Sequence, residues 1–102
     1  MRVRILGQYY EVRFFPYLGK DKEGRRYHGF CDHPDKPNKQ IKLLSGERGK
    51  EFLDSAIHEF THGSKWGMSE EFVRDYANDL TEFLLTPEIW ERITDGKDGK
   101  PS

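Results

Sequence analysis

The amino-acid sequence predicts an α+β domain, in which a small antiparallel sheet of three to four strands is followed by two long helices and a short third helix. The first half of the chain holds short segments of β-branched and aromatic residues that alternate with polar ones. The second half holds longer segments in which apolar residues recur at the helical period. Strands that precede helices in this way are typical of α+β domains.

The strands are expected at four places: residues 2–6, 9–15, 26–31 and 40–45. Apolar positions of the first two alternate with polar neighbours: Val3, Ile5, Tyr10, Val12 and Phe14. Gly7 and Gln8 predict a tight hairpin turn between these strands. Pro16 is expected to end the second strand, because proline has no N–H to donate to a neighbouring strand.

Three helices are expected in the second half of the chain. The first covers about residues 49–63, with Gly63 as the residue that ends it. Ser69 is the expected N-cap of the second helix. Its apolar face comprises Phe72, Val73, Tyr76, Ala77, Leu80, Phe83 and Leu84. Thr86 and Pro87 predict the start of the short third helix. The single domain is expected to span residues 1–93, followed by a disordered polar tail at 94–102.

Length and composition limit the classes of protein that this chain can be. Its 102 residues suffice for one hydrophobic core. The formal net charge of −1 gives no electrostatic reason to expect nucleic acid or a membrane as the main partner. One cysteine excludes an internal disulfide framework, and no membrane-spanning run or signal peptide is recognisable. We therefore expect a cytoplasmic protein.

One alternative groups the basic residues of the first half. If these residues share one surface, the chain is expected to be a nucleic-acid regulator: Arg2, Arg4, Arg13, Arg25 and Arg26. The near-zero net charge argues against this alternative, and its binding would depend steeply on salt.

The strongest chemical signal is His58-Glu59-Phe60-Thr61-His62 in the first expected helix. Residues four apart lie on one face of a helix, so His58 and His62 can bind one metal ion. The pattern is H-E-x-x-H, in which two histidines bind Zn²⁺ and the glutamate acts as general base. The helix is expected to anchor itself through an apolar stripe that includes Phe60 and to present its histidines on the opposite side. The alternative is that this polar side is only a solvated face.

A catalytic zinc ion usually has three protein ligands and an open position, and His₂Glu is a known set. Glu70 and Glu71 follow His62 closely and begin the next helix. Helical geometry places Glu70 at the border of that helix's apolar face and turns Glu71 towards water, so we expect Glu70 to be the third ligand. The alternative is that each glutamate only stabilises the helix start through the helix dipole.

Other residues are weaker candidates. Metzincins continue their motif with a glycine and a third histidine, but this chain has Lys65 and Met68 at those positions. His28 and His33 lie upstream without a ligand spacing. Cys31 is expected to be a reduced, partly buried thiol, because one cysteine cannot form a cysteine-rich zinc site.

The order of these segments resembles that of compact gluzincin-like metallopeptidases, including the ImmA/IrrE type, and most closely the short phage-encoded zincin-like proteins. The resemblance covers roughly residues 2–86. It rests on three segments: Gly29-Phe30-Cys31-Asp32, His58 to His62, and Ser69-Glu70 to Val73. The resemblance implies a zinc peptidase with Glu70 as third ligand. The spacing departs from that of thermolysin-like proteins, whose register would instead favour Glu71 with Asp75.

The expected activity is hydrolysis of a peptide bond. Zn²⁺ on His58, His62 and Glu70 would activate a water molecule, and Glu59 would accept its proton. A peptide or protein substrate would lie along a sheet edge formed by residues 26–31 or 40–45. The alternative is a module without catalytic activity, stabilised by a metal ion, that binds a partner protein.

Overall fold

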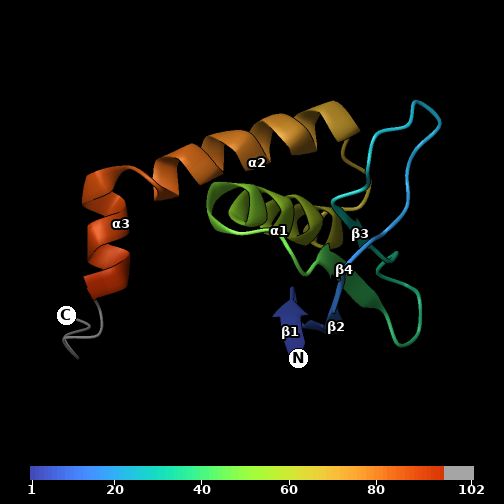
Figure 1. Cartoon of the computed structure of the whole chain (residues 1–102). Coiled ribbons are helices and arrows are strands. Elements are labelled where there is room, and N and C mark those ends of the chain that lie inside the picture. The colour runs from blue at the N-terminus through green and yellow to red at the C-terminus, as the bar shows by residue number, and fades with distance from the viewer. Residues whose placement is uncertain (96–102) are drawn as a thin grey trace.

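The computed structural model describes residues 1–95, which form a four-stranded sheet followed by three helices (Figure 1). The strands are β1 (Arg2–Ile5), β2 (Gln8–Phe15), β3 (Gly29–Cys31) and β4 (Gln40–Leu44). The helices are α1 (Gly49–Ser64), α2 (Glu70–Leu84) and α3 (Pro87–Thr94). The α+β class is confirmed. The expected tail began at residue 94, but α3 includes Thr94, and the tail from residue 96 onward lies outside the described residues.

The sheet has the strand order β1-β2-β4-β3 and is mixed, so the expectation of a purely antiparallel sheet was wrong. β4 pairs in parallel with β2 and antiparallel with β3. The connection through residues 16–39 is long enough to return the chain for a parallel pairing. The third strand begins at Gly29 instead of residue 26, since Arg26 forms only an isolated bridge with Lys20.

The turn between β1 and β2 consists of Leu6 and Gly7, one residue earlier than expected. Both residues have positive φ angles, 48° for Leu6 and 82° for Gly7. Two-residue turns of this kind match the twist of paired strands, and glycine adopts them without strain. The turn therefore sets the β1–β2 register, in which Ile5 faces Gln8.

The core lies between one face of the sheet and α1. Its buried residues come from three strands: Ile5, Tyr10, Val12, Ile41 and Leu43, with Phe52 of α1 packed against them. Phe14 continues the apolar alternation of Tyr10 and Val12, but it is 47% exposed. It stacks on Phe52 at a ring-centroid distance of 6.3 Å, at the margin of the core.

Helix α1 lies between the sheet and α2, so the molecule has three layers (Figure 1). The two helices are antiparallel, so Lys50 at the start of α1 forms an ion pair with Glu82 near the end of α2. α3 contacts α2 alone among the described elements and has no buried residue. This hairpin of α1 and α2 brings the start of α2 back to the end of α1.

Gly63 does not end α1, as the sequence had suggested, because the helix continues to Ser64. Gly63 is buried against the sheet instead. A Cβ atom at this position would lie 3.0 Å from Cδ1 of Ile5 and 3.3 Å from Sγ of Cys31. The missing side chain therefore allows the end of α1 to approach the sheet closely.

The predicted helix starts are confirmed in position. The Ser69 hydroxyl accepts a hydrogen bond from the backbone N–H of Phe72 at 3.1 Å and caps α2. Thr86 precedes α3, although its hydroxyl donates to the Glu82 carbonyl at 3.0 Å and does not cap the helix. Within residues 1–95, no helix has both the length and the apolar character needed to cross a membrane.

Candidate metal centre

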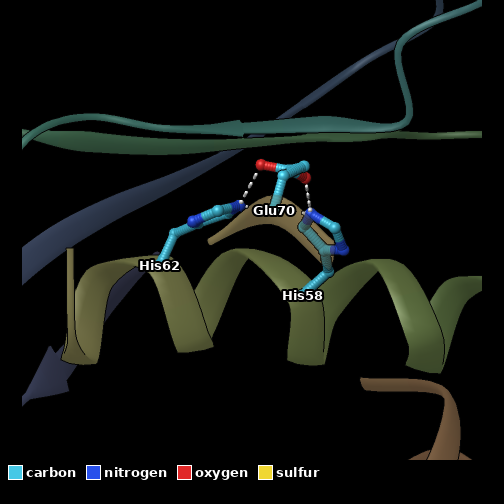
Figure 2. Close-up of side chains that lie close together, drawn as sticks. All are labelled: His58, His62 and Glu70. Atoms are coloured by element: carbon cyan, nitrogen blue, oxygen red, sulfur yellow. Dashed lines mark hydrogen bonds and ion pairs between the residues drawn. The ribbon is translucent and has the colours of Figure 1, made fainter. Parts of the chain in front are cut away.

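His58 and His62 project from α1, one helical turn apart, into a space beside the start of α2 (Figure 2). Their Nε2 atoms are 3.2 Å apart and their ring centroids 4.9 Å apart. Both side chains are half-buried. The i, i+4 spacing thus places one nitrogen of each ring at a common point, as the motif requires.

Glu70 completes the arrangement from the first turn of α2. Its Oε1 lies 2.7 Å from Nε2 of His58, and its Oε2 lies 3.1 Å from Nε2 of His62 (Figure 2). Burial opposes ionisation of this carboxyl, but the hydrogen bonds and charges of the two histidines outweigh it and lower the pKa of Glu70. Glu71, the alternative, is exposed and lies outside this group.

The three side chains have the spacing of a metal site. Their ligand atoms all lie within 4.8 Å of one another. Ligands of a tetrahedral zinc ion, each about 2.0–2.1 Å from the metal, are about 3.3 Å apart. The observed separations are of this size, so the group fits a zinc ion after a small outward movement of Glu70. No other cluster of three such ligands occurs within residues 1–95.

Glu59 lies beside the three ligands on the side of α1 that faces the sheet. Its side chain is buried, with the residue only 7% exposed, and it lines the same cavity of about 860 Å³ as His58, His62 and Glu70. Burial, and then the charge of Glu70, raises the pKa of Glu59 to about 8. A cation held by the three ligands would favour the ionised form of this carboxyl group and lower its pKa towards neutrality, where it can take up and release a proton.

Gly29 is a site residue that the sequence did not assign a role of its own. A Cβ atom at this position would lie 2.9 Å from both Cγ and Oε2 of Glu59. The backbone of β3 therefore packs directly on the Glu59 side chain. A glycine in a short strand could have signalled this close approach of another group.

Cys31 and Asp32, which follow Gly29 and Phe30 in the sequence, lie outside the ligand group. Burial, and then the charges of Glu59 and Asp32, raises the pKa of the Cys31 thiol to about 12. One oxygen of Asp32 accepts a hydrogen bond from the backbone N–H of Gln40 at 2.8 Å. These residues join β3 to β4 and do not contribute a third ligand.

Trp66 in the α1–α2 loop packs against the ring of His62, with centroids 6.1 Å apart. His33 also contacts Trp66, with ring centroids 5.0 Å apart in an edge arrangement. His33 lies outside the ligand group. Trp66 was not identified from the sequence, because an aromatic residue in a loop carries no spacing signal.

At the other end of the cavity, His28 pairs with Glu47 and also lies outside the ligand group. Glu47 in turn accepts a hydrogen bond from the Ser55 hydroxyl at 2.8 Å. Burial raises the pKa of the nearby Asp54, against the attraction of His58. The cavity wall here is acidic.

No family model, curated protein or solved structure matches this chain. The resemblance to compact gluzincin-like metallopeptidases therefore stays a prediction.

Proposed function

We propose that this protein is a zinc-dependent peptidase in which His58, His62 and Glu70 hold the ion and Glu59 is the general base. The observation that carries the proposal is the convergence of three ligand atoms beside a buried carboxyl group in one cavity. Two histidines and a glutamate form a known set for catalytic zinc, because they leave one coordination position open.

The chemistry follows from the positions of these groups. A zinc ion held by His58, His62 and Glu70 would act as a Lewis acid that polarises a carbonyl group and lowers the pKa of water. As the water oxygen bonds to the peptide carbonyl carbon, Glu59 accepts the proton that the water loses. Glu59 then gives this proton to the amine nitrogen as the C–N bond breaks. One water is consumed, and Glu59 returns to its starting form.

The edge of β3 is the proposed binding place for an extended peptide. β3 is the last strand of the sheet, and its Gly29 lies against Glu59. A peptide that adds to a free sheet edge is held by backbone hydrogen bonds with little sequence preference. Residues 40–45 do not offer such an edge, since β4 is paired on both sides by β2 and β3.

Glu59→Gln tests the assignment. We expect this variant to keep its zinc but to cleave a quenched fluorescent peptide library about 10²- to 10⁴-fold more slowly, because an amide cannot act as general base. Glu91→Gln is the matched control on an exposed position of α3, outside the cavity lining, and should cleave normally. Unchanged cleavage by Glu59→Gln would refute the role of Glu59.

A second candidate is a binding module without catalytic activity. It is favoured by large apolar side chains that α2 and α3 expose: Phe72, Tyr76, Phe83, Trp90 and Ile93. Zinc binding without cleavage by either wild type or Glu91→Gln would favour this candidate.

We also propose that the protein acts in a reducing compartment such as the cytoplasm. Cys31 is the one cysteine of the chain and is a free, half-buried thiol. Its raised pKa keeps it protonated and unreactive at neutral pH.

A further inference from the structure

The sheet has a second face, which the helices leave open. All three helices lie on the side of the sheet that holds the core (Figure 1). Residues whose side chains point to the opposite side can therefore contact a partner, apart from Leu44 at the end of β4, which is buried. Strand alternation and the pairing register place cationic and aromatic residues together on this side, beside Glu11, Phe15 and Gln40. We name the following six the outer sheet face: Arg2, Arg4, Tyr9, Arg13, Phe30 and Lys42.

The outer sheet face concentrates positive charge, although the whole chain is nearly neutral. Residues 1–46 contain ten basic and five acidic residues, and the acidic excess lies in the later, helical part of the chain. Arg13 and Lys42 are direct neighbours across β2 and β4, a pairing of like charges that weakens a sheet unless an anion lies between them. The net charge of the whole chain, from which no nucleic-acid partner was expected, does not reveal this separation of basic from acidic residues.

The cations of the outer sheet face are available to a ligand. Among residues 1–95, none of Arg2, Arg4, Arg13 and Lys42 forms an ion pair with an acidic side chain. Glu11 is the acidic residue between them, and its carboxylate pairs with the amino group of Met1 at 2.9 Å. Arg25, by contrast, is neutralised by Asp21 and Glu23 and takes no part.

Two exposed aromatic rings accompany these cations. Tyr9 is 52% exposed and Phe30 is 40% exposed. Phe30 lies beside Lys42 in the β3–β4 register, and the Arg2 guanidinium lies 4.3 Å from the centroid of the Tyr9 ring. Rings on a sheet that is otherwise cationic can stack on bases while the cations contact phosphates. An acidic peptide would use the cations but has no equivalent use for the rings.

We propose that the outer sheet face binds single-stranded nucleic acid. This binding is independent of the metal centre, since the helix layer that carries the ligands lies on the other side of the sheet. Recognition would depend on phosphates and stacked bases, with little preference for sequence.

Fluorescence anisotropy with a labelled oligodeoxythymidylate of about 12 nucleotides tests the proposal. A chelator in the buffer separates the result from the metal centre. If the four cations contact phosphates, log Kobs should fall with log[salt] with a slope of about −3, at about 0.7 per phosphate. Arg13→Glu combined with Lys42→Glu should weaken binding at least about tenfold and reduce the slope by about 1.4.

The aromatic residues need a separate test. Tyr9→Ala and Phe30→Ala should each weaken binding about fivefold or more with an unchanged salt slope, because stacking releases no counterions. Lys50→Glu combined with Arg92→Glu makes the same change in charge on the helices and should bind like wild type. Thermal unfolding of each variant verifies that it is folded.

Several results would overturn the proposal. One is that wild type does not bind at about 50 mM salt. Another is that Lys50→Glu combined with Arg92→Glu loses as much affinity as Arg13→Glu combined with Lys42→Glu. Equal affinity for polyglutamate, or binding of phosphatidylserine vesicles in place of the oligonucleotide, would also overturn it.

Discussion

The two sides of helix α1 differ in a way that hydrophobicity alone does not predict. On the side facing the sheet and the cavity, Ser55 and Glu59 are buried although both are polar. On the side bordering α2, Phe60 lines a groove with Tyr76 and Leu80 and is 48% exposed, although it is large and apolar. A buried carboxyl group is unfavourable unless something compensates for it, whereas an exposed phenylalanine is common. The buried carboxyl group therefore marks this side of α1 as the candidate functional side.

The largest expected effect on stability concerns Glu59 in metal-free protein. The pKa of Glu59 is about 8 in the native state, against the ordinary glutamate value of 4.5 in the unfolded chain. Between these values the native state holds a proton that the unfolded state has lost, so the free energy of unfolding falls as pH rises. The expected loss is about 1.4 kcal/mol per pH unit at most. Above about pH 8 both states are ionised and the fall ends.

Urea unfolding with a chelator, measured from about pH 5 to about pH 8, gives this loss directly. Glu59→Gln should lack the part of the pH dependence that Glu59 causes, while Glu91→Gln, an exposed position outside the cavity, should retain it. Identical pH dependence in wild type and Glu59→Gln would show that the Glu59 carboxyl group is not buried in the native state.

A somewhat smaller effect is expected from Gly29→Ala. The added methyl group would overlap the Glu59 side chain, and overpacking of this kind costs about 1–3 kcal/mol of unfolding free energy. Gly46→Ala is the control, since a Cβ atom there meets nothing within 4 Å. Adding Glu59→Ala should reduce the cost of Gly29→Ala in a double-mutant cycle. Additive effects would show that the two residues are not in contact.

The smallest effect is expected on the apolar side of α1. Phe60→Ala should lower the free energy of unfolding by no more than about 1 kcal/mol, because the ring is already half-exposed. Phe52→Ala should cost about 2 kcal/mol or more, because Phe52 packs against the core. Chemical denaturation of both variants makes the comparison. A larger loss for Phe60→Ala would mean that this side of α1 is buried by a partner.

Much of the fold follows from local sequence. β-Branched residues and glycine turns marked the strands, and Ser69 and Pro87 marked the starts of α2 and α3. The parallel pairing of β4 with β2 was missed, because strand order depends on contacts between distant segments. Phe72 and Tyr76 were assigned to a buried face, but Val73 and Ala77 fill the narrower contact with α1.

The metal ligands of the candidate site were predictable from the sequence, but the residues that pack around them were not. The i, i+4 spacing is a local property, so the meeting of His58 and His62 could be foreseen. Glu70 could be placed by helix geometry, because the turn after α1 is short. Gly29 and Trp66 could not, since their approach to Glu59 and His62 depends on how β3 and the α1–α2 loop pack on the helix.

Metal content, measured by elemental analysis after reconstitution with zinc, tests the central claim most directly. Wild type and Glu71→Ala should each bind close to one zinc ion per chain, since Glu71 lies outside the ligand group. His58→Ala should lose the ion, and Glu70→Ala should bind it much more weakly. A wild-type protein that takes up no zinc, or a Glu70→Ala variant that binds it as tightly as Glu71→Ala, would contradict the proposed site.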